Sequence, residues 1–113
     1  MLAWKRSKKL AVEIYRISES GPLSRDFGLR DQMRRTAVSV PSNIAEGDER
    51  DTDKDSVRFL FIAKGSLAEL RTQMEIAGEI GSLASGDFVR PDAECADIGR
   101  MLGALIKARQ PNS

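Results

Sequence analysis

The sequence contains no histidine and a single cysteine, Cys95, among its 113 residues. Without histidine, the chain cannot form a Ser-His-Asp triad, a Cys-His pair or an imidazole metal site. One cysteine cannot form a disulfide within the chain or a cysteine metal cluster. Its place on the apolar face of a predicted helix indicates a buried hydrophobic side chain. We therefore expect no enzymatic activity, no cofactor and no metal site.

The sequence also lacks an excess of either charge and lacks long apolar runs. Its 18 basic residues nearly balance its 17 acidic ones, so nucleic-acid binding would need a local basic patch. No segment approaches the roughly 18 continuous apolar residues of a membrane span, so we expect no membrane partner. The start has a basic KRSKK segment and no signal-peptide pattern, which favours a cytoplasmic location. The length predicts one domain, residues 1–113.

What the sequence does contain is helical periodicity, in four segments. We expect an all-α fold with helices at about 3–17, 26–47, 53–80 and 91–108. The Gly-Pro pair in 18–24 predicts a turn, 48–55 a polar linker and 81–88 a loop, with Pro91 in the first turn of the last helix. Short connections between consecutive helices favour antiparallel neighbours, so these elements predict an up-down-up-down four-helix bundle.

Pro41 lies inside the second predicted helix. Apolar residues before and after the proline share one face: Leu29, Met33, Ala37, Val40 and Ile44. We therefore predict one helix, kinked near Pro41, whose freed Ala37 carbonyl is bonded by Ser39, Ser42 or a water. The alternative is that a helix ends at Val40 and a new one starts with a capping box of Asn43 and Glu46. Gly47 would end the segment as the C′ residue.

The third predicted helix carries two apolar stripes, whereas a helix in a small monomeric bundle needs only one. The second stripe also includes Ser66 and Gln73, and we expect it to contact another subunit. Its predicted interface residues are Phe59, Ile62, Ile76 and Ile80. Gly65, in the middle of this helix, is expected to allow close approach of a neighbouring helix.

Charged residues gather in three places. Two basic clusters are candidates for nucleic-acid contact: Lys5, Arg6, Lys8 and Lys9 in the first helix, and Arg30, Arg34 and Arg35 in the second. The alternative for both clusters is a solvated face with salt bridges to neighbouring helices. The acidic segment 46–55 lacks the turn glycine and the final glutamate of an EF-hand, so it predicts a solvated linker. We expect Asp53 or Asp55 to cap the third helix.

Three motifs carry a family resemblance. Trp4, the pair Leu10-Ala11 and the pair Ile14-Tyr15 match a W…LA..IY pattern. The segment LRDQMRRTAVSVPSNIAEG, 29–47, follows L..Q.RRAA.S.P.NIAEG, and FLFIAKGSLAELRTQ, 59–73, matches F…IA.GSL.EL.T. With these motifs, the sequence resembles the four-helix bundle proteins of the 23S rRNA intervening-sequence family.

The resemblance implies an antiparallel four-helix bundle and a homo-oligomeric ring, with five protomers in members of this kind. It implies no enzymatic activity. A related accessory protein of the reverse transcriptase in diversity-generating retroelements is markedly basic, and the near-neutral balance of this chain departs from that pattern. We therefore expect a pentameric helical scaffold that binds a partner, protein or nucleic acid. The alternative is a nucleic-acid-binding accessory protein that uses the two basic clusters.

Overall fold

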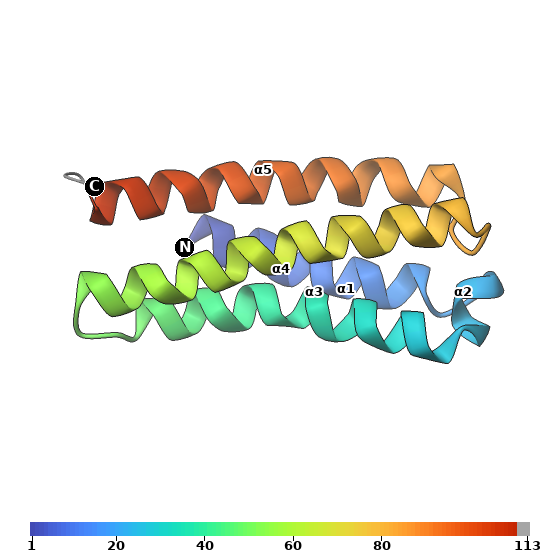
Figure 1. Cartoon of the computed structure of the whole chain (residues 1–113), viewed down its shortest axis with the longest axis horizontal. Coiled ribbons are helices and arrows are strands. Elements are labelled where there is room, and N and C mark those ends of the chain that lie inside the picture. The colour runs from blue at the N-terminus through green and yellow to red at the C-terminus, as the bar shows by residue number, and fades with distance from the viewer. Residues whose placement is uncertain (111–113) are drawn as a thin grey trace.

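The computed structural model describes residues 1–110, and these residues form five helices and no strand. The helices are α1 (Leu2–Ile17), α2 (Gly21–Arg25), α3 (Phe27–Asp48), α4 (Asp53–Glu79) and α5 (Ser85–Arg109). Figure 1 shows the four long helices lying lengthwise beside one another, with the short α2 at one end of the molecule. The prediction of an all-α chain is confirmed.

Side-chain caps fix the start of two of the long helices. The carboxylate of Asp26 accepts a hydrogen bond from the backbone N–H of Leu29 at 3.3 Å, and α3 begins at the next residue, Phe27. Thr52 Oγ1 accepts from the N–H of Asp55 at 3.2 Å, so α4 begins at Asp53. Thr52 is therefore the N-cap, and not Asp53 or Asp55 as predicted; both aspartates lie in the first turn of α4, where carboxylates are favoured by the positive helix end.

Two predicted connections are partly helical in the structure. The turn expected in 18–24 contains the start of α2, because Pro22 suits a first helical turn and Leu23, 1% exposed, is buried in the core. The loop expected in 81–88 ends early, because α5 already begins at Ser85. Pro91 is therefore inside α5 and buried, not in its first turn. Packing of Phe88 and Pro91 against the core outweighs the hydrogen bond that proline removes.

Helix α3 runs through Pro41 without a break, so the alternative of two separate helices is wrong. Val40 and Ile44, on either side of the proline, are 0% and 1% exposed. Asn43 does not start a helix; its side-chain amide donates to the carbonyl of Ser39 at 2.8 Å. The Ser39 hydroxyl donates to the carbonyl of Thr36 at 2.7 Å, not to that of Ala37 as expected. The kink itself stays a prediction.

The apolar faces of the long helices meet in one core. Helix α1 packs against α3 and α5, and α4 packs against the same two helices. The molecule measures 46 × 20 × 19 Å, as expected when helices of this length lie side by side. The largest side chains that are fully buried include Ile14, Leu23, Met33, Ile44, Leu60, Leu70, Met74, Ile98 and Leu102.

Two glycines have roles different from those predicted. Gly47 does not end α3 as a C′ residue; it is buried inside the helix, where α3 passes close to α4. Gly65 does not mediate a close approach, because a Cβ atom built on it would meet nothing within 4 Å. Periodicity identified the helices but did not show which glycine faces a neighbour.

Some of these helices are long enough to span a lipid bilayer, but a membrane span must also be apolar. None of the helices within residues 1–110 has a stretch apolar enough to cross a membrane.

Candidate functional site

Arg6, predicted to contact nucleic acid, is bound by acidic residues of its own chain. Its Nε donates to Glu94 Oε2 at 3.0 Å, and its Nη2 donates to the other oxygen of Glu94 and to Asp97 Oδ2 at 3.3 Å. These side-chain hydrogen bonds from α1 to α5, chiefly the one to Glu94, raise the pKa of Arg6. Arg6 therefore joins two helices and has little capacity left for a ligand.

Arg30 and Arg34 are also occupied within the chain. Arg30 donates to Asp31 Oδ1 at 2.9 Å and to the Ser24 carbonyl at 3.0 Å, and the hydrogen bond to Asp31 lowers the pKa of that carboxyl. Arg34 donates to Ser18 Oγ at 2.8 Å and stacks over the Tyr15 ring, with its guanidinium carbon 4.6 Å from the ring centroid. These contacts follow the alternative interpretation of the clusters, that of bonds to neighbouring helices.

Four of the predicted basic residues remain exposed: Lys5, Lys8, Lys9 and Arg35. Lys8 lies over the Trp4 ring at 4.4 Å from its centroid, so this tryptophan already has a cation on one face. None of the four has an ion pair within the part of the chain that the structure describes. The exposed charge of the predicted patch therefore lies mainly on α1.

Lys8 and Lys9 line a surface hollow that the sequence did not predict. The hollow has a volume of about 380 Å³ and is also lined by Val12, Glu13, Arg16 and Arg90. We refer to it as the α1–α5 hollow. Arg16 could have been found from the sequence, because it follows Lys9 by seven residues and so lies on the same helix face. Arg90 could not, because the last helix was expected to begin only at about residue 91, whereas α5 begins at Ser85.

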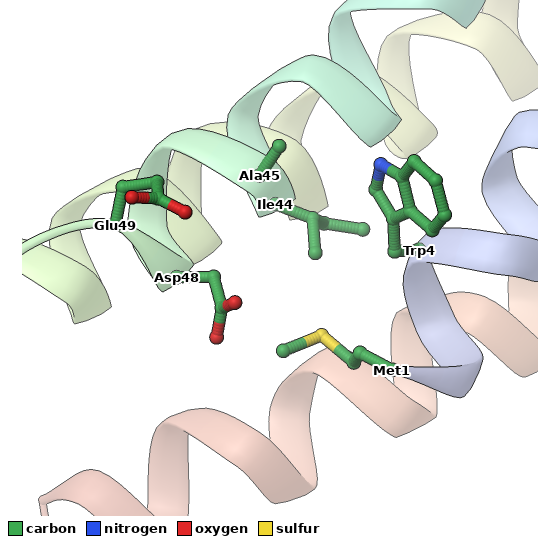
Figure 2. Close-up of a pocket in the computed structure, with 6 residues that line it drawn as sticks. All are labelled: Met1, Trp4, Ile44, Ala45, Asp48 and Glu49. Atoms are coloured by element: carbon green, nitrogen blue, oxygen red, sulfur yellow. The ribbon is translucent and has the colours of Figure 1, made fainter.

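A second, smaller pocket lies where the start of α1 meets the end of α3 (Figure 2). It has a volume of about 180 Å³ and is lined by Met1, Trp4, Ile44, Ala45, Asp48 and Glu49. Figure 2 shows the Trp4 ring on one side of the pocket and the Asp48 and Glu49 side chains on the other. An aromatic ring facing carboxylates is a setting that favours a cationic group over an anionic one.

The predicted interface residues of α4 differ in exposure. Ile62, Ile76 and Ile80 are 44%, 45% and 58% exposed, respectively, whereas Phe59 is half-buried. The guanidinium groups of Arg50 and Arg58 each lie 4.6 Å from the centroid of the Phe59 ring. The three isoleucines therefore remain available to another molecule. Phe61, 52% exposed, is a further apolar side chain on α4 that the predicted interface did not include.

The polar members of the same stripe contact α3 of their own chain. The hydroxyl oxygens of Ser39 and Ser66 are 2.7 Å apart, and the Gln73 amide donates to Thr36 Oγ1 at 3.0 Å. Thr36 in turn donates to the carboxylate of Glu69 at 3.3 Å. The middle of the stripe thus fixes how α3 and α4 pack, and the exposed apolar groups lie toward the two ends of α4.

Comparison with known proteins gives a family and a fold, but no activity. A family model described as 23S rRNA-intervening sequence protein matches residues 1–104. The chain is similar to a crystal structure from Bacteroides thetaiotaomicron VPI-5482, of a protein with unknown function from the S23 ribosomal protein family. The TM-score is 0.85 at 20% identity, over 93% of this chain and 98% of that one. A search of the curated proteins finds no match.

Proposed function

The chain belongs to the family of 23S rRNA-intervening sequence proteins, and on this basis we propose that it is a homo-oligomeric scaffold, a ring of five protomers, which acts by binding a partner. The observation that carries the proposal is the exposure of three isoleucines, Ile62 and Ile76 on α4 and Ile80 at its C-cap. Large apolar side chains that gather on one surface commonly mark a contact with another protein. The number of subunits, five, is the number that the family resemblance of the sequence motifs implies.

The proposed protomer is an antiparallel up-down-up-down four-helix bundle. Its support is the connectivity: α3 joins α4 at one end of the molecule, and α4 joins α5 at the other (Figure 1). Each of the four long helices packs against two others, α1 and α4 each lying against α3 and α5. In this arrangement α4 has neighbours on two sides, and its remaining surface faces outward.

Contact between copies would remove the exposed part of these isoleucines from water. Full burial of an isoleucine side chain contributes about 1.5–3 kcal/mol, so closing the exposed half contributes about 1 kcal/mol per residue. A contact in a ring pairs two different surfaces, so each contact would bury three such residues against another face of the next protomer, and the exposed Phe61 would add to this driving force. Replacing Ile76 and Ile80 by aspartate tests the proposal, because a charge at a buried contact opposes association.

A second candidate function is nucleic-acid binding by an accessory protein. The observation that favours it is the exposed basic charge on α1, from Lys5, Lys8 and Lys9, which form no ion pair among residues 1–110 and which a ring would repeat in every protomer. Against it, Arg6, Arg30 and Arg34 are held by their own chain. Affinity for RNA that falls steeply with salt would support this function, and no RNA binding at low salt would contradict it.

A further inference from the structure

We propose that the α1–α5 hollow is a binding site for a phosphate group, held by Lys8, Lys9, Arg16 and Arg90. The hollow combines four cations from two helices with a single carboxylate, that of Glu13. Helix α1 alone supplies only three of these cations, Lys8, Lys9 and Arg16. It exists because α5 begins at Ser85 and so brings Arg90 beside α1.

Three of the four cations have no acidic partner. Lys8, Lys9 and Arg16 form no ion pair within the described residues 1–110. Like charges grouped around one hollow repel one another, and dissolved salt at physiological concentration screens that repulsion only beyond about 8–10 Å. A bound oxyanion would relieve the repulsion and accept charge-assisted hydrogen bonds from several of these side chains at once.

Glu13 holds Arg90 in place at the edge of the hollow. Both Nε and Nη2 of Arg90 donate to Glu13 Oε2, the former at 2.9 Å, while the Arg90 side chain stays 75% exposed. This pairing leaves the other amino group of the guanidinium, Nη1, without a partner among the described residues. Arg90 is therefore positioned by one carboxylate and is still able to donate to a ligand.

The charge and size of the hollow favour phosphate among the anions. With one carboxylate against four cations, the lining carries a net charge of +3, which suits a ligand of high charge density and several acceptor oxygens. A volume of about 380 Å³ admits a phosphate or a diphosphate group. Two sources share this chemistry: a phosphodiester of a nucleic acid, and a free or small-molecule phosphate. Only the nucleic-acid phosphodiester rests on the proposed nucleic-acid-binding function.

The test compares the double variant K9Q/R16Q with the wild-type chain and with R25Q/K54Q. All four replaced side chains are exposed and make no hydrogen bond or ion pair within the described chain. Lys9 and Arg16 line the hollow, whereas Arg25 and Lys54 do not. Both variants lose the same charge, so only position differs between them. One probe is a short fluorescein-labelled polyuridine RNA, followed by anisotropy over a salt series. The other is inorganic pyrophosphate, followed by shifts of the backbone amide resonances of α1.

Each outcome decides the proposal. It is supported if K9Q/R16Q weakens RNA binding about tenfold at low salt and reduces the salt slope by about 0.7 per lost contact, while R25Q/K54Q does not. It is also supported if RNA does not bind but pyrophosphate shifts the α1 amides of the wild type and not of K9Q/R16Q, a result that rejects the nucleic-acid function alone. Equal RNA binding by both variants, with no pyrophosphate effect, overturns the phosphate site and leaves the nucleic-acid function standing. No binding of either probe overturns both.

Discussion

Gly47 lies so close to Ser56 that a Cβ atom on the glycine would be 3.0 Å from the serine's carbonyl oxygen. The same Cβ would be 3.3 Å from the Cβ of Phe59, so both the backbone and a side chain of α4 limit the space. Any larger residue would force α3 and α4 apart near the turn that connects them. The glycine of the NIAEG motif is therefore explained by helix packing.

Replacing Gly47 by alanine should destabilise the protein by about 1–3 kcal/mol, the usual cost of adding a methyl group to a filled core. Gly65→Ala is the matched control, because this glycine is also helical but has open space around it. That substitution should stabilise by about 0.5–1 kcal/mol through helix propensity. Urea denaturation of the two variants measures both effects, and a stabilised G47A would contradict the close packing.

The contact between Arg6 and Glu94 predicts a loss of stability when the arginine is removed. Arg6→Gln should lower the thermal midpoint, because Glu94 and Asp97 would lose the cation that joins them to α1. Lys5→Gln is the control, since Lys5 is exposed and has no ion pair among the described residues. High salt should narrow the difference between the two variants. Equal midpoints for both variants at low salt would show that the contact contributes nothing.

Cys95 should be unreactive in the folded protein. The side chain is 1% exposed, and burial raises the pKa of its thiol from 9.0 to about 12. At pH 8 almost no thiolate is present, so a thiol reagent such as DTNB should label the chain only after unfolding in guanidinium. Rapid labelling of the native protein would contradict the burial of this residue.

The same pKa shift predicts a contribution to stability that depends on pH. A thiol with a raised pKa stays protonated in the fold, so its contribution is fully present below pH 9 and is lost as the pH rises from about 9 to 12. Comparing the wild type with Cys95→Ala removes the effects of lysine and tyrosine titration. The difference in free energy of unfolding should shrink through this range, and a constant difference would argue against the shift.

Most of the fold could be predicted from the sequence, because each long helix has an apolar stripe that follows the helical period. The phase of the stripe across Pro41 predicted one helix, and the burial of Val40 and Ile44 agrees with it. The short helix α2 and the early start of α5 were missed. Both depend on tertiary packing, of Leu23 in one case and of Phe88 and Pro91 in the other. Glycine and proline in these segments predicted a turn or a helix start, and such local signals do not report tertiary packing.

Less of the candidate site could be predicted. The composition identified basic residues but could not show that Arg6 faces Glu94, since the two are 88 residues apart in the chain. The composition also could not show that Arg90 lies beside α1, where it pairs with Glu13. Exposure of Ile62, Ile76 and Ile80 followed from periodicity, whereas the bonds of Ser66 and Gln73 to α3 depend on how the helices are rotated against each other.

Introducing negative charge at the C-terminal end of α4 should disrupt assembly without unfolding the protomer. Ile76→Asp with Ile80→Asp adds carboxylates to an exposed surface, so helicity measured by circular dichroism should stay near that of the wild type, while the assembly should become smaller. Leu2→Asp with Val89→Asp is the matched control, because these side chains are 61% and 66% exposed and lie on other helices. Equal particle size for both double variants would place the contact elsewhere.

The most direct test of the proposed scaffold is the mass of the wild-type protein in solution, measured by native mass spectrometry at micromolar concentration. We predict a complex of five times the 12.5 kDa chain mass. A single species at the mass of one chain would contradict the proposal that this protein functions as a ring.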